Sequence, residues 1–249
     1  MKFMVTFNEM DMPDFLKVRA VHTSILPEIK NSYKNIAGGF GVVESGTAIG
    51  GKRIELDVII VPPKNKNLLQ AQRELAFWLM GNDFKTSPLV ISDEPHLEYM
   101  AKVDEGVDIK DLLFAGEGTI PFFVPSGVAY GRHLRHGAME SPNRLFVDYL
   151  GTAPSFPVFE FTPSKEYRNT TLRIAHIETG DTFLLTGNFK AGEKVTIDSS
   201  KRLVKKGEQL SLDMIDLKSK WLKLKGRRIN NFTFNLEGEL KLTYKEAWL

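Results

Sequence analysis

Cysteine is absent from the 249-residue chain. Its absence excludes disulfides, thiolate nucleophiles, Cys-ligated zinc and iron–sulfur clusters, and leaves any metal site to histidine and carboxylate ligands. Charge of one sign is also scarce, because 33 Lys and Arg against 31 Asp and Glu leave a formal charge of +2. So small an excess does not indicate an electrostatic nucleic-acid binder.

Long apolar runs are missing as well. No stretch approaches the about 18 consecutive apolar residues of a membrane span, and Thr6, Asn8 and Glu9 interrupt the place where a signal peptide needs an unbroken apolar segment. We therefore expect a soluble protein, made in the cytoplasm and without a membrane partner. Hydrophobic residues at 42% and charged residues at 26% are ordinary globular usage, and the length favours two modest domains.

The first half of the chain alternates strand signals with one helical signal. Arg53 to Val61 (RIELDVIIV) is apolar and β-branched and stops at Pro62 and Pro63, which is typical of a strand and its end. Beyond Asn65 to Asn67, apolar residues from Leu68 to Met80 recur at spacings of three and four before Gly81 and Asn82, which predicts a helix. Further strands are predicted at Leu89–Ser92, Leu97–Val103 and Ile120–Val124, the first two joined by a tight turn at Asp93-Glu94-Pro95-His96.

The polar stretch from Gly131 to Asn143 lacks either apolar period and is predicted to be a linker, with a domain boundary at 137. Short strand-like runs separated by turn residues follow it, which favours an antiparallel sandwich. These runs are Pro157–Phe161, Thr171–His176, Asp181–Leu185, Lys194–Ile197, Arg202–Val204, Trp221–Leu224, Asn231–Asn235 and Glu239–Tyr244.

No compact metal or acid/base motif occurs. His133 and His136 are the closest histidine pair, and their place in the predicted linker explains them as well as zinc binding does. The adjacent carboxylates Asp93 and Glu94 lie in the predicted turn, and in a strand they would point to opposite faces, which is poor geometry for sharing one substrate. The acidic group Asp104, Glu105 and Asp108 lacks the spacing of a calcium loop. We expect no catalytic, metal or cofactor site.

Glycine is concentrated in one segment, AGGFGVVESGTAIGGKR, from Ala37 to Arg53. A dinucleotide-binding loop would need a third glycine and a following helix, whereas this segment runs into a predicted strand. The better interpretation is an extended arm that lies against a neighbouring chain. Its candidate contact residues are Gly38, Gly39, Phe40, Gly41, Gly46, Gly50 and Gly51.

Three other features suggest binding or catalysis only weakly. Ser126 has no GxSxG elbow around it. A basic run from Lys218 to Arg228 brackets Trp221 and would suit phosphates or an acidic protein face, but is also typical of a solvated strand face whose buried part is Trp221, Leu222 and Leu224. Exposed aromatics of a sandwich can stack on sugars; the candidates are Tyr167, Trp221, Tyr244 and Trp248.

The order of these segments resembles that of the distal tail proteins of siphophages that infect Gram-positive bacteria. The resemblance covers nearly the whole chain. It is carried by the helix QAQRELAFWLM, by ISDEP followed by Tyr and Ala, by GTAPSFPVFEF at the start of the second domain, and by IETGDTFLL and FKAGEKVTIDSSKRLVKKGE further on.

The resemblance implies a mainly β fold, with an N-terminal belt domain that contains one helix (residues 1–137) and a C-terminal galectin-like antiparallel β-sandwich (138–249). It implies a virion protein of the tail tip that forms a homohexameric ring. The implied partners are the tail tube protein, a tail-associated fibre-like or lysin protein and receptor-binding proteins, with DNA only passing through the ring. The glycine-rich arm is our predicted ring contact, and the hairpin from Ser92 to Tyr99 is a second candidate.

Two functions of other classes remain as alternatives. One is a carbohydrate-binding module of a host-adhesion protein, which the sandwich and its aromatic residues suggest. The other is a hydrolase whose residues come from distant parts of the chain, which sequence patterns alone do not exclude.

Overall fold

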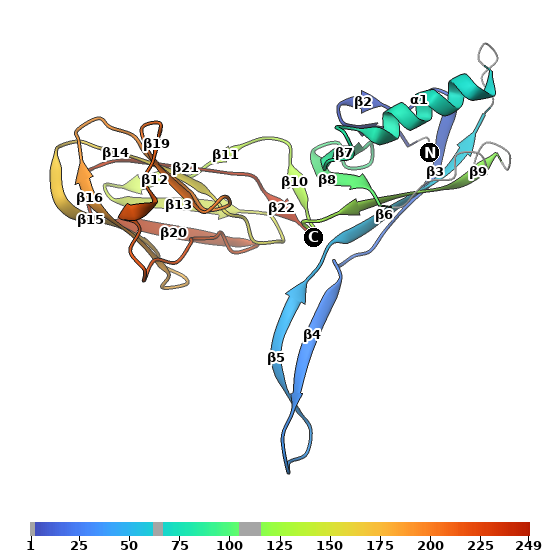
Figure 1. Ribbon diagram of the computed structural model, residues 1–249. Coiled ribbons are helices and arrows are strands. Elements are labelled where there is room, and N and C mark those ends of the chain that lie inside the picture. Colours follow the sequence, from blue (N-terminus) through green and yellow to red (C-terminus); the bar gives the residue numbers. More distant parts are fainter. Residues whose placement is uncertain (1–2, 62–66, 105–115) are drawn as a thin grey trace. The chain divides into compact units, whose positions relative to one another are not determined.

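The computed structural model describes residues 3–61, 67–104 and 116–249 (Figure 1). The chain divides into two compact units, 1–132 and 133–248. Part of the segment predicted to be a linker belongs to the second unit as regular strands, because Arg135–His136 and Ala138–Ser141 pair with the strands beside them. The linker prediction is wrong for this reason. The predicted strand stop at Pro62 and Pro63, the side chain of Leu68, and Glu105 and Asp108 of the acidic group lie outside the described residues.

The first unit contains one extended antiparallel sheet, a helix and a separate two-stranded hairpin. Along the sheet the strands run in the order β2-β1-β7-β8-β9-β6-β3, with β10 paired to β8, while β4 and β5 pair only with each other. The elements are β1 (Val5–Phe7), β2 (Met10–Asp11), β3 (Leu16–Thr23), β4 (Ile29–Asn35), β5 (Val42–Ile49), β6 (Lys52–Ile60), α1 (Leu68–Met80), β7 (Ser87–Ile91), β8 (Leu97–Val103), β9 (Glu117–Val124) and β10 (Ala129–Gly131).

The helix α1 begins and ends where the sequence places its caps. The Asn67 side chain accepts a hydrogen bond from the Gln70 backbone N–H while the Gln70 side chain accepts one from the Asn67 N–H, which satisfies two orphan donors of the first turn. At the other end Gly81, at φ 57°, donates its N–H to the Trp78 carbonyl. A Cβ on Gly81 would also lie 2.8 Å from the ring of Phe7. Both the positive φ and this close contact therefore restrict the position to glycine.

The buried face of α1 contributes an aromatic cluster to the core of the first unit. Phe7, Trp78 and Phe122 pack edge to face with ring centroids 5.0 to 6.3 Å apart. The indole N–H of Trp78 donates to the Met10 carbonyl at 3.0 Å, so the one polar atom of this ring is satisfied. The cluster joins β1, β9 and the helix. None of the helices in the described residues has the length and apolarity needed to cross a bilayer.

The second unit is a sandwich of two antiparallel sheets. One sheet runs β11-β21-β14-β17-β18-β19 and the other β12-β13-β20-β15-β16. The elements are β11 (Arg135–His136), β12 (Ala138–Ser141), β13 (Arg144–Tyr149), β14 (Val158–Pro163), β15 (Tyr167–His176), β16 (Thr182–Phe189), β17 (Val195–Asp198), β18 (Leu203–Lys206), β19 (Gln209–Leu210), the 3-10 helix η1 (Leu212–Met214), β20 (Arg228–Phe234), β21 (Gly238–Tyr244) and β22 (Ala247–Trp248).

The two sheets of the second unit share one apolar core. Alternate residues of each strand point inward, and rings from opposite sheets meet: Phe159 of β14 lies 5.3 Å from Phe232 of β20, and Phe161 lies 6.0 Å from Phe234. The predicted fold class is confirmed, since the described chain is mainly β, with one α-helix in the first unit and a β-sandwich in the second. The strand predicted at Trp221–Leu224 does not form; Leu224 makes only an isolated bridge to Ser155, although Leu222 and Leu224 are buried as expected.

The hydroxyl group of Tyr149 joins three segments at one end of the sandwich by hydrogen bonds. The buried Tyr149 hydroxyl donates to the Ala153 carbonyl at 2.7 Å and accepts the Ala247 N–H at 2.8 Å. We expect Tyr149→Phe to lower the free energy of unfolding by about 1–3 kcal/mol, because it leaves a buried backbone N–H without an acceptor. Urea unfolding checks the value. Tyr33→Phe, at an exposed hairpin position, is the control and should change stability by less than about 0.5 kcal/mol.

Candidate assembly surface

Most of the glycine-rich segment belongs to a β-hairpin, residues 29–49, that shares no sheet with the rest of the described chain (Figure 1). Its strands β4 and β5 pair from Ile29↔Ile49 to Asn35↔Val42, with a shift in register between Ser32 and Tyr33. Every residue of both strands is exposed. A two-stranded hairpin is marginally stable by itself in water, so this one is suited to being completed by another surface.

The seven candidate residues occupy three parts of the hairpin. Gly38, Gly39, Phe40 and Gly41 form the tip, where Gly38 and Gly41 adopt φ of +73° and +90°. Gly46 lies within β5, and Gly50 and Gly51 lie at the base. The glycines at the tip allow the turn, and Phe40 between them is fully exposed, at 105% of its reference area.

The base of the hairpin is closely packed, in contrast to its tip. Two backbone hydrogen bonds join the ends of the hairpin: Gly50 N–H donates to the Glu28 carbonyl at 2.7 Å, and Glu28 N–H donates to the Gly51 carbonyl at 3.0 Å. A Cβ on Gly51 would clash with the ring of Phe123. These two glycines therefore fix where the hairpin leaves the sheet.

Large apolar side chains are unusually exposed along the hairpin. They are Ile29, Tyr33, Ile36, Phe40, Val42, Val43 and Ile49, each with 46% or more of its area exposed. Several exposed apolar side chains gathered in one segment mark an interaction site more often than single scattered ones do. The glycine pattern indicated the arm, and the exposed apolar residues come from both of its strands and from its tip.

The second candidate contact, the hairpin from Ser92 to Tyr99, is held together internally. The Tyr99 hydroxyl donates to Glu94 Oε2 at 3.0 Å, and burial together with the Glu94 charge raises the pKa of Tyr99 far above its usual value. Lys52 is buried nearby, and burial lowers its pKa while the Glu94 carboxylate acts in the opposite direction. Glu94 of the turn at 93–96 thus interacts with Tyr99 and Lys52 of its own unit.

The side chains considered for metal or hydrolytic chemistry lie in separate segments of the described chain. No group of three or more His, Asp and Glu side chains in this part of the chain is placed to hold a metal ion. His136 lies 3.4 Å from the Thr243 hydroxyl, and the Ser126 hydroxyl donates to the Val128 carbonyl. Of the predicted acidic group, Asp104 pairs with Arg53 at 2.7 Å.

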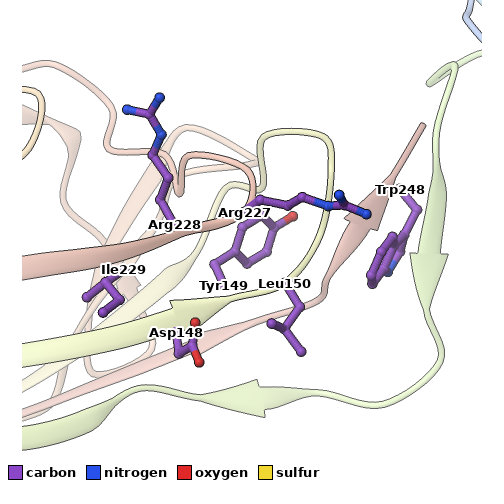
Figure 2. A pocket seen from close by; sticks show the side chains of 7 residues that line it. All are labelled: Asp148, Tyr149, Leu150, Arg227, Arg228, Ile229 and Trp248. Carbon is purple, nitrogen blue, oxygen red and sulfur yellow. The ribbon is translucent and has the colours of Figure 1, made fainter.

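A shallow pocket of about 550 Å³ lies at the end of the second unit where β13 stops and β20 starts (Figure 2). Charged and apolar side chains from three distant segments line it, among them Asp148, Leu150, Arg227, Arg228, Ile229 and Trp248. The basic run of the sequence thus ends at a pocket. Its remaining members are spread along a loop: Lys220 pairs with Asp181 at 2.9 Å, and Trp221 packs on Phe183 at 4.8 Å.

The four candidate sugar-stacking aromatics have different environments. Tyr244 is buried, Trp221 is half-buried against the core, and the Tyr167 hydroxyl accepts the Glu237 N–H at 2.9 Å. Trp248 lines the pocket at the end of the second unit.

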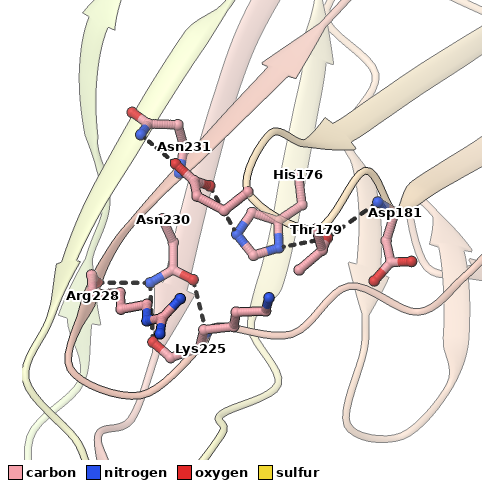
Figure 3. Close-up of polar contacts among 8 residues, drawn as sticks. His176, Thr179, Asp181, Lys225, Arg228, Asn230 and Asn231 are labelled. Atoms are coloured by element: carbon pink, nitrogen blue, oxygen red, sulfur yellow. Dashed lines mark hydrogen bonds and ion pairs between the residues drawn. The ribbon is translucent and has the colours of Figure 1, made fainter.

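A buried histidine, His176, lies in a polar network where β15 pairs with β20 (Figure 3). His176 is 1% exposed, stacks on Phe232 at 4.7 Å, and has its Nδ1 3.1 Å from the Thr179 hydroxyl. Its Nε2 lies 3.1 Å from Glu178 Oε2. Burial lowers the pKa of His176, an effect that the Glu178 carboxylate opposes, so the ring is neutral at neutral pH.

Acidification should therefore destabilise the second unit. The pKa of His176 in the folded chain lies below the unfolded value of about 6.5, so the unfolded chain binds the proton more readily. The stability is therefore fully present above about pH 6.5 and is lost as the pH falls from there through the lower pKa of the folded state. Calorimetry at about pH 7.5 and 5.5 measures the loss of Tm. We expect His176→Gln to show a smaller loss than the unmodified chain; equal losses in both proteins would exclude His176 as the titrating group.

Two family models match the chain, one over each unit. Residues 13–124 match the phage tail protein RIFT-related domain, and residues 150–248 match the C-terminal domain of the siphovirus-type tail component. Together they span most of the chain and define it as a component of a phage tail. The chain belongs to the family of siphophage distal tail proteins, as the resemblance in the sequence indicated.

Solved structures share the fold at low sequence identity. The crystal structure of the Dit protein of phage SPP1, described as a paradigm of the hub adsorption apparatus in phages that infect Gram-positive bacteria, has a TM-score of 0.77 at 17% identity over 99% of each chain. A chain of the baseplate of phage P2 in its activated conformation with calcium has a TM-score of 0.51 at 8% identity, over 98% of this chain and 97% of that one. No curated protein matches by sequence.

Proposed function

We propose that this chain is the structural hub of a siphophage tail tip or baseplate and that it acts as a homohexameric ring. The ring joins the tail tube protein to the tail-associated fibre-like or lysin protein, offers attachment for receptor-binding proteins, and leaves an axial passage for DNA. It is made and assembled in the cytoplasm of the bacterial host. Its work is done by complementary surfaces and involves no catalysis.

The observation that carries this proposal is the exposed β4–β5 hairpin. A ring of identical chains needs a heterologous contact, in which one patch on each subunit meets a different patch on the next. A projecting hairpin with seven exposed apolar side chains supplies one half of such a contact. Membership of the distal tail family supports the ring and the tail partners as the context of that contact.

The mass of the purified protein in solution tests the proposal. Light scattering should give six times the 28.1 kDa of one chain, and negative-stain images of the same peak should show rings with a central hole. A monomer at micromolar concentration, with both units folded, would contradict self-assembly. The alternative function as a carbohydrate-binding module would then become the main one to test.

A further inference from the structure

The pocket at the end of the second unit combines cationic, acceptor and apolar groups in a small space (Figure 2). Asp148 and Ile229 are direct partners across β13 and β20, and Leu150 follows on the same face as Asp148. Leu150 and Ile229 are 54% and 57% exposed. A volume of about 550 Å³ lies within the ordinary range for small-ligand sites.

The guanidinium groups of the two pocket arginines have no carboxylate partner in the described part of the chain. Neither Arg227 nor Arg228 forms an ion pair within the residues that the structure describes, although carboxylates elsewhere on this unit pair with Lys165, Lys194 and Lys220. The guanidinium of Arg227 extends toward Trp248 in Figure 2. An unpaired guanidinium beside an apolar surface is suited to a carboxylate or phosphate, which it can bind with two parallel hydrogen bonds.

Hydrogen bonds from a buried side chain and from a neighbouring loop fix the turn that carries these arginines. Asn230, fully buried, accepts the Lys225 N–H at 2.7 Å and donates to the carbonyls of Lys225 and Arg228 (Figure 3). Arg227 donates its N–H to the Gly151 carbonyl at 2.9 Å. A Cβ on Gly226 would lie 2.6 Å from the Thr152 carbonyl oxygen, so the turn is pressed against this neighbouring loop. Such bracing reduces the entropy lost on binding a ligand.

We propose that this pocket binds an anionic sugar, that is, a pyranose carrying a carboxylate or a phosphate. Arg227 binds the negative group, the Asp148 carboxylate accepts a sugar hydroxyl, and the Leu150, Ile229 and Trp248 side chains cover the apolar face of the ring. A neutral sugar would leave Arg227 without its anion. All residues that line the pocket belong to the second unit, whereas the proposed ring contact is the β4–β5 hairpin of the first, so the proposal goes beyond the role as a hub.

Saturation-transfer NMR on the full chain tests the site with matched ligands. Glucuronic acid and glucose differ at C6 alone, where one has a carboxylate and the other a hydroxymethyl group, and glucose 6-phosphate places a phosphate at the same carbon. We expect transfer to glucuronic acid, to glucose 6-phosphate or to both, weakening at about 0.5 M NaCl, and at most a trace to glucose. The relative signals tell whether a uronic acid or a sugar phosphate is preferred.

The decisive variant is Arg227→Gly. Arg227 adopts φ +48°, a conformation that glycine accepts more easily, so the substitution removes the guanidinium without straining the fold. We expect the affinity for the anionic sugar to fall roughly tenfold or more, the size typical of a lost charged hydrogen bond. Arg202→Gly is the matched control, because Arg202 is also exposed, also has a positive φ of 53° and lies in the turn before β18.

Three results would overturn the proposal. These are equal transfer to glucose and glucuronic acid, unchanged binding in Arg227→Gly, and a parallel loss of binding in Arg202→Gly. Binding of a poly-glutamate peptide at Arg227 in the absence of any sugar binding would also reject it, and would assign the pocket to an acidic protein segment instead. None of these outcomes depends on the mass of the assembly, so they are distinguishable from a failure of the hub.

Discussion

Removal of residues 29–49 is expected to leave two folded units that no longer assemble. The hairpin shares no sheet with the rest of the first unit, and Glu28 and Gly50 are already joined by a 2.7 Å hydrogen bond at its base. A short Gly-Ser linker can therefore replace the hairpin without moving β6. Light scattering should then report the mass of one chain, and the far-UV circular dichroism should keep the signal of the remaining strands.

Point variants test the same contact with less disruption. Phe40→Ser removes the most exposed ring of the hairpin tip, and its burial against a neighbour is worth about 1.5–3 kcal/mol per contact. Leu217→Ser is the matched control, since Leu217 is 103% exposed and lies in the second unit. Assembly should weaken in the first variant and stay intact in the second. A deletion variant that still forms complete rings would reject the hairpin as the ring contact.

Phe232→Ala is expected to have the largest effect on the stability of the second unit. The ring is fully buried between the two sheets, edge to face with Phe159 at 5.3 Å and stacked on His176 at 4.7 Å. Its removal leaves a cavity that strands of both sheets line, and close-packed interiors relax only partly around such a cavity. We expect a loss of about 3–5 kcal/mol in the free energy of unfolding, measured by urea denaturation.

Ile229→Ala on the same strand provides the comparison. Ile229 is 57% exposed on the outer face, so its truncation should change stability by less than about 0.5 kcal/mol. Similar losses in Phe232→Ala and Ile229→Ala would mean that the two sheets do not share the close-packed core described above. Neither substitution touches the hairpin, so assembly of the surviving folded chains should be unaffected.

Local sequence signals were sufficient wherever one face of an element is buried. The helix Leu68–Met80 was predicted because its apolar spacing and the glycine after it agree, and β6 because alternate residues of Lys52–Ile60 are buried against the core. The turn at 93–96 and the strands β7 and β8 on either side of it follow from Asp and Pro between two apolar runs. In these cases local propensity and tertiary packing favour the same structure.

Sequence patterns failed mainly where a strand has no buried side. The segment 133–143 has no apolar period because β11 and β12 are short, exposed edge strands that pair with residues of β21 and β13. The arm was predicted only as an extended segment, since β4 is polar and neither strand has a buried side. Trp221–Leu224 shows strand-like composition but is held by side-chain burial, with one bridge to Ser155.

The sequence predicted the arm as a candidate site but did not predict the pocket at the end of the second unit. The arm is one continuous segment, so its glycines and Phe40 could be named as a contact from the sequence. The pocket joins residues near 148, 227 and 248, which only the pairing of β13 with β20 and the return of the last strand bring together. Within the basic run, the sequence did not distinguish Lys220, which is paired, from Arg227, which is free of ion pairs in the described chain.

Cross-linking from the hairpin tip tests the central claim most directly. Because the chain has no cysteine, Phe40→Cys introduces a single thiol, which can carry a maleimide-benzophenone group. On irradiation of the assembled protein we expect links between copies of the chain, giving a ladder of up to six on a denaturing gel, with Leu217→Cys giving far fewer. Rings that remain hexameric while the label at residue 40 reacts only within its own chain would contradict the assignment of this hairpin as the ring contact.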